Sequence, residues 1–203
     1  SNDAVWTPRN APLHFVKDIP PFKDNSIFEE FNDNSNGAGA YLFAGMTNGL
    51  NTAGVGKLRR ALLAFAIADS LPAGAVVDSV RLTVHISKVP DNTARATTLH
   101  RVTANWGEGA SDAGDPGGQG TAAEPGDATW FYRIYATESW TATGGDFIAT
   151  ASAQTNFGVN NSFPVWASAQ MAADVQGWLD TPLTNHGWIV RGDEATQQSA
   201  KRF

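Results

Sequence analysis

The chain has 203 residues, no cysteine and a formal net charge of −6, from 14 basic and 20 acidic side chains. Without cysteine, disulfides, iron–sulfur clusters and thiol nucleophiles are excluded. The acidic balance provides no basic field for phosphate backbones, so we expect no nucleic-acid partner. Only 17 % of the residues are charged, a composition typical of a loop-rich, secreted or cell-surface β-protein in contact with the extracellular medium.

The longest apolar stretch, residues 61–67, is only as long as a strand, so we expect no membrane insertion. The sequence has no basic start followed by an apolar segment, so we expect that an export signal, if the protein has one, has been removed or was never included in this sequence. Four prolines within the first 21 residues predict an extended N-terminal arm over residues 1–22. No repeat or shift in composition divides the remainder, which predicts one domain over residues 23–203.

Strands dominate the first half of this domain. We expect strands at 23–29, at 41–44 and at 59–67, the last as a buried central strand. Apolar and polar residues alternate over 80–86, which indicates a strand with one buried face. A turn at 90–93 and a strand at 96–103 would complete an antiparallel hairpin, with His85 opposite His100.

The second half begins with a glycine-rich segment, residues 107–126, which predicts a long surface loop. Short strands are expected at 130–135, 147–152 and 188–190. Apolar residues at spacings of three and four over 168–179, with Pro182 just beyond, predict one short helix near the C-terminus. The fold class that follows is all-β.

A set of short segments recurs in order along the chain: Lys23-Asp24-Asn25, Phe28-Glu29, 35–39, 59–65, 71–74, 99–102, 105–109, 126–130, 174–179, 185–188 and 200–203. Together these segments resemble the DNRLRE domain family of secreted bacterial surface proteins. The resemblance implies a jelly-roll β-sandwich of two antiparallel sheets. It also implies a noncatalytic module that binds polysaccharide or a cell-surface component, because a related branch is a carbohydrate-binding module family.

The chain departs from the family pattern in two places. Family members often read Trp-x-His where this chain reads Trp130-Phe131-Tyr132, and they usually continue past the Ala-Lys-Arg-Phe motif into an Asp-Ser-Arg-Glu strand. The sequence also lacks a Gly-x-Ser-x-Gly elbow, and none of its four histidines lies in a motif for a catalytic base. We therefore expect no enzymatic activity.

Aromatic side chains are the candidates for ligand binding, because sugar rings stack on aromatic planes. Trp178 and Trp188 are expected in the core. Trp106 and Trp130 border the long loop and are expected to be half exposed. The candidate ligand-binding residues are Trp106, Trp130, Tyr132 and Trp140. The scarcity of basic clusters makes a neutral glycan at least as suitable as a polyuronate.

Metal binding is a second hypothesis. Opposed strand residues have Cβ atoms about 5 Å apart, so His85 and His100 could share one copper ion, with Trp130 nearby. Ordinary polar-face histidines are the alternative interpretation. A structural Ca²⁺ could be held by Asp24, Glu29, Asn32 and Asp33, or by Glu108 and Asp127 beside the long loop. No EF-hand spacing is present.

A third hypothesis is a structural subunit of an extracellular layer or filament. The proline-rich arm and the missing family strand favour it, because an open sheet edge permits self-association between neighbours.

Overall fold

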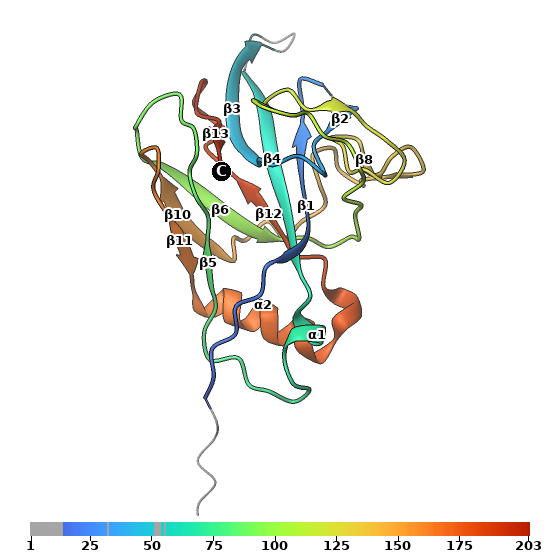
Figure 1. The fold of residues 1–203 in the computed structure, drawn as a ribbon, viewed down its shortest axis with the longest axis vertical. Coiled ribbons are helices and arrows are strands. Elements are labelled where there is room, and N and C mark those ends of the chain that lie inside the picture. The colour runs from blue at the N-terminus through green and yellow to red at the C-terminus, as the bar shows by residue number, and fades with distance from the viewer. Residues whose placement is uncertain (1–13, 32, 51–53, 55) are drawn as a thin grey trace, which may run out of the picture.

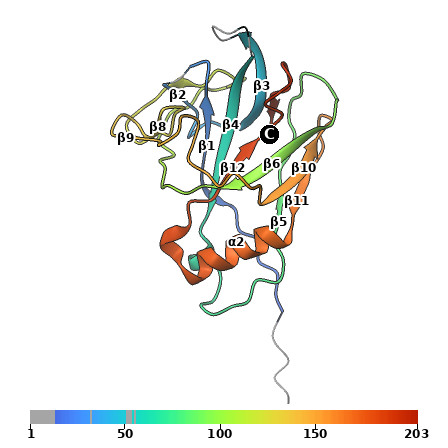
Figure 2. The ribbon, with the colours of Figure 1, turned by 180° about the vertical axis from the view of Figure 1, so that it is seen from behind.

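The computed structural model describes residues 14–31, 33–50, 54 and 56–203. The N-terminal segment 1–13 of the predicted arm and Asn32 lie outside the described residues. The fold is mostly β, and every strand pair is antiparallel (Figures 1 and 2). The predicted fold class is therefore correct at the level of antiparallel sheets.

The largest sheet has seven strands in the order β10-β6-β12-β4-β3-β13, with β1 also paired to β4. Its strands are β1 (Pro21–Phe28), β3 (Phe43–Leu50), β4 (Gly56–Phe65), β6 (Arg95–Arg101), β10 (Ala153–Phe157), β12 (Trp188–Arg191) and β13 (Lys201–Arg202). Three two-stranded sheets pair β5 (Arg81–Thr83) with β11 (Val165–Ala167), β2 (Asn34–Ser35) with β7 (Thr121–Ala122), and β8 (Tyr132–Ile134) with β9 (Glu138–Ser139).

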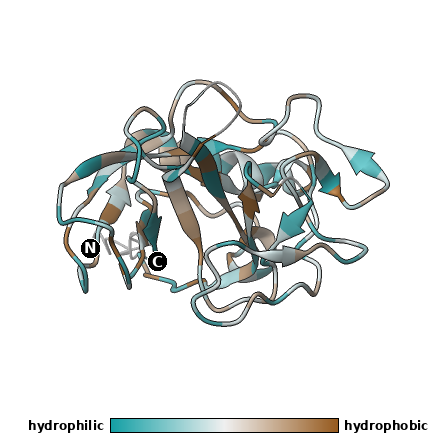
Figure 3. Ribbon diagram, turned by 90° about the horizontal axis from the view of Figure 1, so that it is seen from above, coloured by the Kyte–Doolittle hydropathy of each residue, from teal (hydrophilic) through white to brown (hydrophobic). Residues whose placement is uncertain are grey.

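The central strand β4 is apolar along most of its length because both of its faces are covered. Leu63 and Phe65 belong to a core cluster that also contains residues of β6, β10, β12 and α2 (Ala169–Asp180). Leu62 and Ala64 point to the opposite face and join a second cluster beneath the loops of residues 103–149. Figure 3 shows apolar residues concentrated in the central strands and hydrophilic residues in the peripheral loops. The prediction of a buried central strand is confirmed.

The helix α2 forms where the spacing of apolar residues predicts it. Ser168 caps its N-terminus by accepting a hydrogen bond from the Met171 amide at 2.9 Å. The buried carboxylate of Asp174 accepts hydrogen bonds from the Ser152 hydroxyl at 2.5 Å and from the Trp188 indole at 3.0 Å, which attaches the helix to the sheet. A four-residue helix, α1 (Ile67–Ser70), and a 3₁₀ turn, η1 (Pro182–Thr184), were not predicted.

The predicted hairpin of residues 80–86 and 96–103 is wrong. β5 pairs with β11, whereas β6 pairs with β10 and β12. Residues of β5 and β6 pack against the same core cluster without pairing, so the chain crosses the core between them. The alternation of apolar and polar residues indicates that one face of a strand is buried, but it does not identify the neighbouring strand. The strand expected at 130–135 forms over 132–134 only, and the strand expected at 147–152 is wrong, since the next strand along the chain is 153–157.

The glycine-rich segment 107–126 is a surface loop, as predicted, and it is anchored to β1 by the buried side chain of Asn25. The Asn25 amide donates to the Glu108 carbonyl at 3.0 Å and to the Ala128 carbonyl at 3.2 Å. Its Oδ1 accepts hydrogen bonds from the Ser35 hydroxyl and the Asn36 amide. One fully buried amide therefore joins three segments that are distant in sequence.

Replacing Asn25 with Ala is expected to lower the free energy of unfolding by about 3 kcal/mol, because several buried groups lose their partners. Urea denaturation at neutral pH measures this effect. Asn92→Ala, at an exposed position, is the matched control and is expected to change stability by less than about 0.5 kcal/mol. Equal effects of the two substitutions would contradict the role of Asn25.

Candidate functional site

Three strands of the large sheet bring polar residues to the face that lies opposite the α2 core. Arg60 of β4 pairs with Arg191 of β12, and Arg191 pairs with Thr98 of β6. Alternate residues of these strands share a face, so the three side chains form a row across the sheet. The loops of residues 103–149 cover part of this face, and the row lies beside them.

Arg60 is 8 % exposed, and each of its three guanidinium nitrogens donates a hydrogen bond. It binds both carboxylate oxygens of Glu194, at 2.7 and 3.0 Å, and donates to the Gly144 carbonyl at 2.7 Å. The rings of Trp130 and Phe147 lie 5.0 and 5.4 Å from it, within the range of cation–π attraction.

Arg191 shares two of these partners, Glu194 and Phe147. Its Nε donates to Glu194 at 3.2 Å, and its guanidinium lies 5.2 Å from the Phe147 ring. Phe147 is therefore in contact with two cations, which share the single negative charge of Glu194. Burial alone would raise the pKa of Glu194, but its hydrogen bonds and charge pairs with the two arginines hold that pKa below its usual value.

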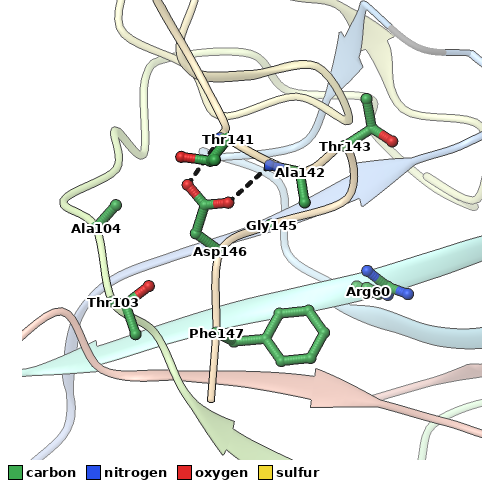
Figure 4. A pocket seen from close by; sticks show the side chains of 9 residues that line it. All are labelled: Arg60, Thr103, Ala104, Thr141, Ala142, Thr143, Gly145, Asp146 and Phe147. Atoms are coloured by element: carbon green, nitrogen blue, oxygen red, sulfur yellow. Dashed lines mark hydrogen bonds between the residues drawn. The ribbon is translucent and has the colours of Figure 1, made fainter. Parts of the chain in front are cut away.

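An open groove of about 630 Å³ adjoins this cluster (Figure 4). The loop of residues 141–147 forms one wall, and residues 103–104 form another. The lining residues are Arg60, Thr103, Ala104, Thr141, Ala142, Thr143, Gly145, Asp146 and Phe147. A second hollow, of about 560 Å³, lies on the Arg191 side of the cluster and is lined by Thr98, Glu194 and residues 191–195, with Leu58 and Ala96.

The charged groups of both hollows are already occupied by partners within the protein. The Asp146 carboxylate accepts hydrogen bonds from the amides of Thr141 and Ala142, both at 2.8 Å (Figure 4). Asp193 accepts hydrogen bonds from two amides and lies 3.6 Å from Arg95.

By contrast, the hydroxyls of Thr103, Thr141 and Thr143 make no hydrogen bond to another described residue. The groove thus offers hydroxyl groups, one aromatic ring and compensated charges.

The predicted ligand-binding tryptophans do not form this site. Trp106, Trp130 and Trp140 are 1 %, 6 % and 5 % exposed and build the second core cluster, so the expectation of half-exposed rings is wrong. The indole of Trp106 donates to the His186 carbonyl at 2.8 Å, and that of Trp140 to the Thr129 carbonyl at 2.9 Å.

The fourth candidate, Tyr132, is partly buried in β8 and packs against Tyr135, with the ring centroids 5.5 Å apart. Trp178 and Trp188 lie in the core, as predicted. The aromatic residue in the groove is Phe147, which the sequence analysis missed. The turn formed by Gly144, Gly145 and Asp146 just before it was the only local signal.

The structure does not bring together the predicted copper ligands His85 and His100. His85 is exposed, stacks on Phe163 at 4.9 Å and contacts Asn161 Oδ1 at 3.3 Å. His100 is 4 % exposed, and its two ring nitrogens contact the Ile148 carbonyl and the Thr98 hydroxyl, both at 2.9 Å.

Burial lowers the pKa of His100, which favours a neutral ring. A shared metal ion required His85 and His100 to lie opposite each other in the predicted hairpin of residues 80–86 and 96–103, and that hairpin does not form. Trp130, the third member of that set, lies buried beneath Arg60. The ordinary polar-face interpretation fits the contacts of both histidines.

Five of the six calcium candidates lie among the described residues, and two of these, Asp24 and Glu108, are joined by a hydrogen bond from the Asp24 amide to Glu108 Oε1 at 3.0 Å. Glu29 accepts a hydrogen bond from the Leu58 amide, and Asp33 is exposed. Asp127 is buried and accepts a hydrogen bond from the Glu124 amide. Within the described ranges, no three acidic, histidine or cysteine side chains are grouped to hold a metal ion. Structural Ca²⁺ therefore stays a prediction.

The fold and groove together define a mostly β protein with an open groove lined in part by threonine hydroxyls. A scan against protein-family models gives no match, and a search of curated proteins finds no relative. The resemblance to the DNRLRE family therefore stays a prediction. In the part of the chain that the structure describes, no helix has the length and apolar character needed to cross a lipid bilayer.

Glu194→Gln is expected to lower the free energy of unfolding at pH 7 by about 3 kcal/mol, because a buried cation loses its counter-charge. A carboxyl with a lowered folded-state pKa contributes stability above its unfolded-state pKa and loses it as the pH falls through the folded-state pKa. The difference between the two proteins should therefore shrink towards pH 3. Urea denaturation at pH 7, 5 and 3 measures it.

The control is Glu138→Gln, which alters a more exposed pair with Arg133. Pairs of this kind contribute less than about 1 kcal/mol. A Glu194→Gln variant as stable as the control at pH 7 would contradict the role assigned to Glu194.

Proposed function

We propose that this protein is a noncatalytic, secreted or cell-surface module that binds a neutral polysaccharide in the groove beside Arg60. The proposal includes a jelly-roll arrangement of the antiparallel sheets, which the family resemblance implies. The low charged fraction supports a location outside the cell.

One observation carries the proposal: the charged groups of the groove are paired, and its threonine hydroxyls are not. A ligand that carries charge would have to compete with Glu194 for the arginines or with two amides for Asp146. A ligand rich in hydroxyl groups can instead pair with Thr103, Thr141 and Thr143. Phe147 supplies an apolar ring edge for the C–H face of a sugar.

The openness of the groove also favours a polymer. Two open hollows, one lined by Arg60 and the other by Arg191 and Glu194, would accommodate several sugar units of one chain without enclosing either of its ends. A small cofactor would be expected in a deeper and more apolar site. Catalysis needs an acid or a base free to exchange protons, whereas Asp146 and Glu194 are both held by hydrogen bonds.

The double substitution Thr141→Val and Thr143→Val is expected to weaken binding about tenfold, since two hydroxyl contacts of roughly 0.7 kcal/mol each are lost. The measurement is isothermal titration calorimetry with the best neutral polysaccharide from a glycan array that also carries alginate. Thr83→Val, on the exposed side of β5, is the matched control and should bind like the wild type.

Exclusive binding of charged polymers, or equal affinity of the double variant and the wild type, would overturn the proposed site. Reducing sugars released from the bound polysaccharide on long incubation would overturn the noncatalytic assignment.

A further inference from the structure

A second polar cluster lies at the start of β1, away from the groove. The Lys23 Nζ donates to Asn105 Oδ1 at 3.1 Å and to the Trp106 carbonyl at 2.5 Å. It also lies 4.2 Å from the centroid of the Trp106 ring, which shields it from water on one side. Lys23 is thereby fixed against a carboxamide that is 82 positions away in the sequence.

The contact places an amine near an electrophilic carbon. A carboxamide C=O bond is about 1.2 Å long, so the Asn105 Cγ lies no more than about 4.3 Å from Nζ. Reaction within a protein requires approach to about 3–3.5 Å, so a small rotation of either side chain is sufficient. Arg133 donates to the Asn105 carbonyl at 3.0 Å, which fixes the backbone of the acceptor residue.

The surroundings favour a free amine. Burial lowers the pKa of Lys23 to about 8, although the nearby charge of Glu108 opposes this change. Lysines desolvated in this way act as nucleophiles. Beside the amine, burial and the charge of Glu108 raise the pKa of Asp24 to about 6, so the Asp24 carboxyl retains a proton more readily than an isolated one.

We propose that Lys23 and Asn105 react to form an intramolecular isopeptide bond. The lone pair of Lys23 Nζ attacks Asn105 Cγ, a new Nζ–Cγ bond forms and the Cγ–Nδ2 bond breaks. The amine gives up one proton, the departing nitrogen gains one, and ammonia leaves. Glu108 and Asp24 relay that proton. No oxidant, cofactor or further reactant is needed, because the carboxamide carries its own leaving group.

The bond would fix the first strand of the large sheet to the segment that follows β6. β1 is attached to the sheet through β4, and the Asn25 network lies two residues further along the strand. A covalent link at Lys23 would prevent β1 from detaching at the end that continues into residues 14–20. This inference does not depend on polysaccharide binding.

The test is intact mass spectrometry of the purified full chain. We expect a mass below that of the sequence by one ammonia molecule. Tryptic digestion should then yield one branched peptide composed of residues 18–57 and 102–133, because trypsin does not cleave after an acylated lysine. Fragmentation of this peptide locates the bond at Lys23 and Asn105.

Lys23→Arg and Asn105→Ala should each restore the full mass, while Asn160→Ala, at an exposed position, should keep the deficit. A full-mass wild-type protein with free Lys23 would overturn the proposal. So would a deficit that persists in Lys23→Arg, because a succinimide at Asn105 also loses ammonia but does not need the lysine. The branched peptide is sought in the wild-type protein, so the result does not depend on the folding of any variant.

Discussion

The charge of Arg60 is the constraint on which the groove and the loops around it depend. An arginine on the central strand carries a cation into a position that is 8 % exposed, where an unpaired charge would be strongly destabilising. The compensation comes from Gly144, 84 positions away, and from Glu194, 134 positions away. One guanidinium thus fixes the loop that forms a wall of the groove and the C-terminal segment that borders the second hollow. The planar, forked geometry of arginine allows it to hold both at once.

The groove is polar because the tryptophans of the loops that cover this face lie in the core and not at the surface. Trp106, Trp130 and Trp140 fill most of the second core cluster on this side, because the covering loops otherwise contribute only Ala104, Ala128 and Phe147 to it. Their indole nitrogens are directed to backbone carbonyls within the protein. What remains at the surface of this face is the set of threonines on the covering segments and the one ring held between Arg60 and Arg191.

Local sequence signals predicted the elements that depend on local physics. The apolar run of β4 and the capped, periodic helix α2 were found at nearly their true positions, because burial on two faces and a serine cap are readable within a dozen residues. The partner of β5 was not predictable in this way. The roles of Phe147 and Glu194 depend on contacts with Arg60 across more than 80 positions, and no local pattern encodes them. The exposed fraction of a tryptophan likewise depends on which loop covers it.

Arg60, Lys201 and Lys23 are partly buried cations that differ in how their charge is compensated. This difference makes the first two structural and the third chemically reactive. Arg60 has a bidentate carboxylate and remains a cation at all ordinary pH values. Lys201, 2 % exposed, donates to two carbonyls and lies 4.0 Å from the Asp91 carboxylate.

Lys23 has only neutral oxygens as hydrogen-bond acceptors, while the nearby Glu108 is engaged by the Asp24 amide. Its amine is therefore the one whose burial is least offset by a direct ion pair, and loss of the proton relieves that cost. The same desolvation that would destabilise a charged lysine thus makes it a nucleophile, and a carboxamide lies within reach.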